Sequence, residues 1–117
     1  MQHHTILYIF DQADRSNSVL TAIKETGCEV VGTNSPSEGV ALLYILGQVA
    51  AVVLDSGVLE HASFDVERSL RRVRPTVPVM LECGDRIDGS SLSTDDCVST
   101  DQLVFALQHL LAAESVA

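Results

Sequence analysis

The sequence has no tryptophan and few other aromatic side chains: of its 117 residues, 4% are aromatic. It therefore offers little surface on which a flavin ring or a nucleobase could stack. No loop after an apolar segment is rich enough in glycine to cradle a phosphate group. Together these two absences count against a protein that binds a flavin or a nucleotide.

Basic residues are also scarce. The chain has seven of them and sixteen acidic residues, which gives a formal net charge of -9. Such a surface repels the phosphates of nucleic acids, so we expect no direct nucleic-acid partner. No apolar run approaches the ~20 residues that cross a bilayer. The N-terminal stretch MQHHTILYIF lacks the basic region and cleavage site of a signal peptide, so no membrane partner is expected either.

Cysteines are few and scattered: Cys28, Cys83 and Cys97 form no CxxC pair. In a sequence without a secretion signal, an odd and scattered set predicts reduced thiols in the cytoplasm. No Ser/His/Asp set or histidine-rich ligand group is evident, and we interpret His61 and His109 as surface residues. We therefore predict a cytoplasmic protein without enzymatic activity of its own.

What the sequence does contain is a regular alternation of two kinds of segment. Short apolar runs predict strands at residues 5–10, 28–33, 50–55, 77–83 and around 97–98. Stretches with helical periodicity predict helices over residues 19–26, 36–46, 63–74 and 103–114. Polar residues 11–18 are expected to form a loop, and residues 84–96 contain too few apolar side chains for a helix of ordinary length.

Helix boundaries are also marked. Ser35-Pro36-Ser37-Glu38 combines an N-cap serine, a proline in the first turn and a glutamate placed for a capping box. Gly27 is placed to end the first helix, and Gly47 follows the second. The third ends in Arg71, Arg72 and Arg74, whose charges suit the negative end of the helix dipole and are interpreted as a solvated face.

Strands that alternate with helices predict one domain with a parallel sheet covered by helices on both faces. In such a sheet, functional groups collect beyond the carboxyl ends of the strands. Asp11 follows the first predicted strand, and Asp55 is the last residue of the third. This pair of acids is a candidate site that depends on no family relationship.

Several segments, taken in order, resemble the receiver domain of two-component response regulators. ILYIFDQAD resembles the first strand with its acidic end, and AAVVLDSGVL resembles the third strand with its phosphoacceptor aspartate. The other similar segments are LTAIKETGCEV, SPSEGVALL and VPVMLECG. The resemblance covers nearly all of residues 5–113 and implies a single receiver-like domain over residues 1–117. Its fold would be flavodoxin-like, as in chemotaxis regulators: a doubly wound, five-stranded parallel sheet of order 2-1-3-4-5, here with a short or absent helix 4.

The resemblance also implies a chemistry. A histidine kinase or phosphotransfer protein would pass a phosphoryl group to Asp55, with Mg²⁺ held by Asp11, Asp55 and the backbone carbonyl of Gly57. A hard cation requires such oxygen ligands and neutralises charge on the transferring group.

The sequence departs from the family at several of these positions. Phe10 replaces one of the two adjacent acids after the first strand, and Cys83 stands at the hydroxyl position. Thr100 stands at the position of the family's lysine. Asp101 replaces the following proline, and Cys97 the aromatic switch residue. The one lysine, Lys24, belongs to the first helix, which leaves Arg86 as an alternative cation.

Three functions remain open at this point. The first is an atypical receiver that accepts a phosphoryl group on Asp55 in a weakened site. The second is a degenerate pseudo-receiver that binds another signalling protein without phosphorylation. The third is a flavodoxin-like binder of a small ligand, which the fold would permit. The sequence leaves the oligomeric state open, as it does whether this domain stands alone or belongs to a larger protein.

Overall fold

The computed structural model describes residues 4–11, 13–55, 57–58, 62–82, 97–98 and 102–109. Its strands are β1 (Thr5–Ile9), β2 (Glu29–Thr33), β3 (Ala51–Asp55), β4 (Val79–Glu82) and β5 (Cys97–Val98). Its helices are α1 (Ala13–Glu25), α2 (Pro36–Ile45) and α4 (Val66–Val73), together with a helix over residues 102–109. Each predicted strand and helix is therefore present, with shifts at the boundaries.

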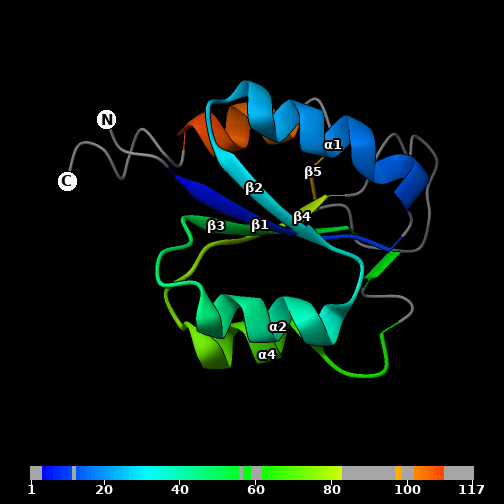
Figure 1. Cartoon of the computed structure of the whole chain (residues 1–117), viewed down its shortest axis with the longest axis vertical. Coiled ribbons are helices and arrows are strands. Elements are labelled where there is room, and N and C mark those ends of the chain that lie inside the picture. Colours follow the sequence, from blue (N-terminus) through cyan, green and yellow to red (C-terminus); the bar gives the residue numbers. More distant parts are fainter. Residues whose placement is uncertain are drawn as a thin grey trace.

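The strands form one parallel sheet in the order β2-β1-β3-β4-β5. The sheet lies between two layers of helices, with α1 and helix 102–109 on one face and α2 and α4 on the other (Figure 1). The predicted doubly wound, flavodoxin-like architecture is confirmed. The segment in which a short or absent fourth helix was predicted, residues 84–96, lies outside the described residues.

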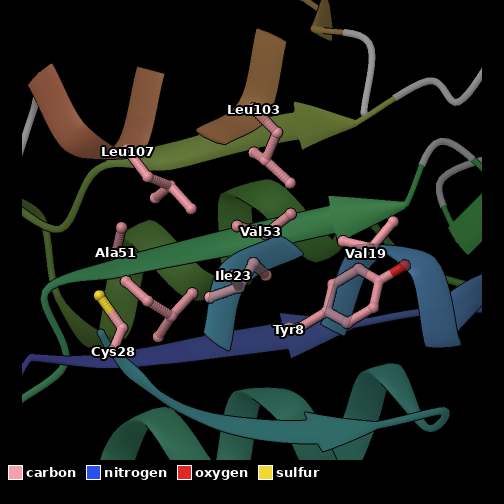
Figure 2. Close-up of a cluster of buried hydrophobic side chains, with 9 residues drawn as sticks. Tyr8, Val19, Ile23, Cys28, Ala51, Val53, Leu103 and Leu107 are labelled. Atoms are coloured by element: carbon pink, nitrogen blue, oxygen red, sulfur yellow. The ribbon is translucent and has the colours of Figure 1, made fainter. Parts of the chain in front are cut away.

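Alternate residues of the central strands supply two separate cores. Ile6, Tyr8 and Val53 face α1 and helix 102–109, whose Leu103 and Leu107 point toward the sheet (Figure 2). Residues of the opposite parity face α2 and α4 and form the second core: Leu7, Ile9, Val52, Leu54, Leu43, Val66 and Leu70. Both faces of β1 and β3 are thus covered, as their unbroken apolar sequences require. Each fully buried aliphatic side chain contributes about 1.5–3 kcal/mol to this packing.

The predicted end signals account for several element boundaries. Gly27 has a φ of 87°, a left-handed conformation that suits glycine and ends the turn after α1. The Ser35 side chain accepts a hydrogen bond from the Glu38 amide, and Pro36 begins α2. Asp65 caps α4 in the same way, by accepting from the Arg68 amide at 3.0 Å.

Two boundary predictions were wrong. The polar segment expected to be a loop after Asp11 is helical from Ala13 onward, because its polar residues form the opening turns of α1. The helix predicted over 63–74 begins at Val66, since Asp65 takes the capping position and leaves Phe64 outside, 37% exposed.

Candidate functional site

Asp55 is the last residue of β3, where the central strand reaches the carboxyl edge of the sheet. All five residues of the strand are buried, and Asp55 itself is 2% exposed. The backbone amide of Gly57 donates to Asp55 Oδ1 at 3.3 Å. An aspartate that accepts from the amide two residues later stabilises a local turn, so the carboxylate is held at the strand end.

Asp11 lies directly against the turn that follows Asp55. A Cβ atom added to Gly57 would meet Asp11 Oδ2 at 3.1 Å and Asp11 Cβ at 3.2 Å. Only a residue without a side chain leaves this space to the Asp11 carboxylate without a shift. The structure therefore brings Asp11, Asp55 and Gly57, three residues singled out from the sequence, to one point at the sheet edge.

Phe10, the neighbour of Asp11 in the chain, packs against other side chains of the domain. Its ring packs on Tyr8, with centroids 5.4 Å apart, and approaches Gly32 closely enough that a Cβ there would lie 3.3 Å from Phe10 Cε1. The ring also packs against the core beneath α1. Phe10, at the position where the resemblance to receiver domains implies a second acid, therefore supplies packing and no metal ligand.

A further acid, Glu82, was missed in the sequence. Glu82 ends β4 and pairs in register with Asp55, and it is 1% exposed. Two residues earlier, the register pair Val53 and Met80 packs into the core beneath α1, so Asp55 and Glu82 share that face of the sheet. Neighbouring strands are about 4.8 Å apart, which places the two side chains next to each other. The signal was present: VMLE, like AVVLD, is an apolar run that ends in a carboxylate.

A hollow of about 240 Å³ adjoins Asp11 on the side of α2. Its lining combines polar and apolar side chains: Phe10, Asp11, Asn34, Pro36, Ser37, Val58, Ala62, Ser63 and Phe64. The Asp11 carboxylate therefore borders both the Gly57 turn and open space large enough for a few solvent molecules or a small group.

Cys83, Thr100 and Arg86 lie outside the described residues. Lys24 is exposed in the last turn of α1, a helix that starts at the carboxyl edge of the sheet and runs away from it, so it lies far from Asp55. In the described part of the chain, no three His, Cys, Asp or Glu side chains form a group that could hold a metal ion. A cation in this part of the site would have at most two carboxylate ligands and would depend on backbone carbonyls, water or a phosphate for the remainder.

Sequence comparison gives no relatives: no protein-family model and no curated protein matches the chain. Solved structures do match. A response regulator receiver domain protein from Clostridium thermocellum has a TM-score of 0.72 at 17% identity, over 97% of this chain and 98% of that one. A receiver protein from Sinorhizobium medicae has a TM-score of 0.70 at 21% identity, over 96% and 97% of the two chains.

The receiver domain of TorR, the response regulator of a TMAO respiratory system, matches with a TM-score of 0.68 at 23% identity, over 94% of this chain and 98% of that one. These matches span almost the whole length of both chains. The similarity therefore concerns the fold of nearly the whole chain. The chain has the fold of response regulator receiver domains.

Proposed function

We propose that the chain is a receiver-type signalling domain of a two-component system in which Asp55 accepts a phosphoryl group from a histidine of a partner kinase or phosphotransfer protein. The observation that carries this proposal is the convergence of Asp11, Asp55 and Gly57 at the carboxyl edge of a receiver fold. A carboxylate oxygen of Asp55 attacks phosphorus, the P–N bond to the imidazole breaks, and an acyl phosphate forms. In this proposal the domain accepts a phosphoryl group in the cytoplasm and turns over no substrate of its own.

Mg²⁺ would be held by the carboxylates of Asp11 and Asp55 and by the Gly57 carbonyl. These are hard oxygen donors, and Mg²⁺ is commonly bound through one or two carboxylates together with water and phosphate oxygens. The close approach of Asp11 to Gly57 supports this assignment, because it brings the second carboxylate to the turn that follows Asp55. When bound, the ion neutralises negative charge on the transferring group. The hydrogen bond from the Gly57 amide orients the Asp55 carboxylate, and Asp11 supplies the second negative charge of the site.

A second candidate is a pseudo-receiver that signals by binding a partner without phosphorylation. Glu82 favours this function, because a carboxylate beside Asp55 repels a phosphoryl group that carries up to two negative charges. The 2% exposure of Asp55 favours it as well, since a phosphodonor must reach that carboxylate. Both candidates are signalling roles, and both use the same fold.

The two are distinguished by the mass of the intact protein after incubation with acetyl phosphate and MgCl₂. The first predicts one added phosphoryl group, which Asp55→Asn abolishes and Asp65→Asn, a change at the exposed cap of α4, leaves in place. If the folded wild-type chain gains no mass at saturating donor and metal, phosphorylation of Asp55 is excluded and the pseudo-receiver remains.

None of the helices within the described residues is long and apolar enough to cross a membrane.

A further inference from the structure

The outer face of the layer formed by α2 and α4 combines exposed apolar side chains on α2 with exposed arginines on α4. On α2, Ala41, Tyr44 and Ile45 are exposed, with Tyr44 at 78% and Ile45 at 72%. The two helices pack side by side on one face of the sheet (Figure 1). Their exposed side chains therefore belong to one continuous surface.

Contact with the sheet accounts for the apolar residues on only one side of α2. Gly39 and Leu43 are its buried residues, and they face β1 and the second core. The exposed residues Ala41, Tyr44 and Ile45 lie on the opposite side at spacings of three and four, which defines a second apolar stripe. A helix that is apolar all round is normally covered on all sides. In this structure the second stripe faces solvent.

Positive charge is concentrated on the neighbouring helix, α4. Four of the seven basic residues of the chain lie within residues 68–74, in α4 and its C-cap. Arg71 pairs with Glu67 at 3.0 Å, and Arg74 donates to the Leu46 carbonyl at the end of α2. Arg68 and Arg72 are exposed and make no ion pair within the described part of the chain. The layer formed by α2 and α4 thus exposes two arginines without an ion pair in the described part of the chain together with tyrosine and isoleucine side chains, although the net charge of the chain is -9.

The structure assigns this face, which we call the α2–α4 surface, to the docking of an acidic amphipathic helix of a partner protein. The apolar side of such a helix would cover Tyr44 and Ile45, and its acidic residues would meet Arg68 and Arg72. Because α2 has ten residues, it offers a platform about 15 Å long, which suits a partner segment of three to four turns.

Charge argues against the other occupants. A second copy placed symmetrically on this face would bring like arginines together, because a two-fold interface matches each patch with itself. A lipid surface or a nucleic acid is an extended array of negative charge that would also face the acidic remainder of the domain, whose net charge is -9. An acidic helix gains from the local arginines and needs to approach only this face.

The surface is independent of Asp55, which lies at the carboxyl edge of the sheet and not on the helix layer. The inference therefore goes beyond the proposed function and is tested separately. Asp55→Asn is expected to leave docking unchanged, so a failure of phosphorylation and a failure of docking give different results.

The test uses the full chain and a synthetic helical peptide of about four turns (~14 residues), with leucines spaced by three and four and glutamates elsewhere. Amide chemical-shift changes locate binding, and a titration gives the affinity. Shifts in residues of α2 and α4 are expected. Tyr44→Ser and Arg72→Glu should each weaken binding about tenfold or more, since exposed aromatic and arginine side chains are typical anchors.

Two control variants match these changes on the opposite face. Phe105→Ser removes an equally prominent ring, 74% exposed on helix 102–109, and Lys24→Glu reverses an exposed charge on α1. Both should bind the peptide as the wild type does, and a version of the peptide with lysine for glutamate should not bind. Equal affinity for the wild type and Tyr44→Ser, or no binding of the acidic peptide, overturns the proposal. So does a dimer in light scattering, or binding to phosphatidylserine vesicles, that Tyr44→Ser abolishes.

Discussion

Glu82 bears directly on the proposed role of Asp55, because it is the register partner of that residue. The two acids are register neighbours on adjacent strands, both nearly without exposure to solvent. A phosphoryl group on Asp55 would bring further negative charge to within roughly 5 Å of the Glu82 position. At an effective dielectric constant of about 20–40, such a pair of unit charges repels by roughly 2–3 kcal/mol.

Replacing this charge with a neutral side chain of the same shape is expected to favour phosphorylation. Glu82→Gln should raise the equilibrium fraction of acyl phosphate formed from acetyl phosphate and Mg²⁺ by about tenfold or more, the change that 1.4 kcal/mol produces. Intact mass gives the fraction, and circular dichroism checks that the variant is folded. Glu67→Gln, on the exposed side of α4, is the matched control and should leave the fraction unchanged. A folded Glu82→Gln variant with no gain would show that Glu82 does not limit the reaction.

A substitution at Gly57 tests the position of Asp11 without removing any proposed ligand of Mg²⁺. Gly57→Ala keeps the backbone carbonyl but adds a Cβ at 3.1 Å from Asp11 Oδ2, so the carboxylate must move by a few tenths of an ångström. We expect affinity for Mg²⁺, measured by calorimetry, to fall about tenfold, as for other changes that displace a metal ligand. Gly47→Ala, where an added Cβ meets nothing within 4 Å, should bind Mg²⁺ normally. An unchanged affinity in Gly57→Ala would place Asp11 outside the metal site.

Single residues also show where sequence reasoning works and where it stops. The location of Asp11 and Asp55 could be predicted, because an acid that ends a buried parallel strand lies at the carboxyl edge of the sheet. Glu82 ends β4 in the same way, but the resemblance to receiver domains implies a site residue only at the next position, Cys83. Register decides which residue stands beside Asp55, and register is a property of paired strands that no single segment reveals.

At the level of elements, α2 is placed by a close contact with the sheet. Gly39 is buried where the helix crosses β1, and a Cβ there would overlap Ile9, meeting Cδ1 and, at 2.7 Å, Cγ1. Ile9 has no exposed surface, so its side chain has little room to move away. The glycine thus sets how closely the helix lies against the second core.

Gly39→Ala should therefore destabilise the protein even though alanine is the better helix former. The gain in helix propensity is up to ~1 kcal/mol, whereas overpacking a tight core costs typically 1–3 kcal/mol. We expect a net loss of about 1 kcal/mol in the free energy of unfolding, measured by urea denaturation. Gly47→Ala lies just beyond the same helix in open space and should be neutral within about 0.5 kcal/mol. A Gly39→Ala variant as stable as the wild type would mean that α2 can shift outward at no cost.

The elements themselves were predictable because their signals are local. Ser35 and Pro36 mark the start of α2 through hydrogen-bonding and φ preferences that act within one turn. The start of α1 was missed since its first residues are polar, and helix periodicity becomes visible only from Val19 onward. The exposure of Tyr44 and Ile45 could not be foreseen, because an apolar helix sequence does not tell which of its sides is covered.

Over the whole molecule, the net charge of -9 is confined to a body of 40 × 27 × 25 Å. At about 0.01 M ionic strength the screening length is ~30 Å, so charges on opposite sides of the domain repel each other. At about 0.1 M it falls to ~10 Å, and most of that repulsion is screened. Sodium chloride should thus raise the melting temperature in this range, because relief of self-repulsion favours the compact state.

Binding of Mg²⁺ at the proposed site adds a specific contribution to stability, which can be separated from the effect of charge screening. At equal ionic strength, MgCl₂ should stabilise the chain more than NaCl does, by about 1.4 kcal/mol when Mg²⁺ is at ten times its dissociation constant. For a domain of this size the increment corresponds to a rise of roughly 4–8 °C in melting temperature. Asp11→Asn should retain the NaCl response and lose the additional Mg²⁺ response, because it removes one of the two carboxylate ligands and little of the net charge. Equal responses to the two salts in the wild type would mean that the -9 charge attracts Mg²⁺ only diffusely and that Asp11 and Asp55 form no cation site.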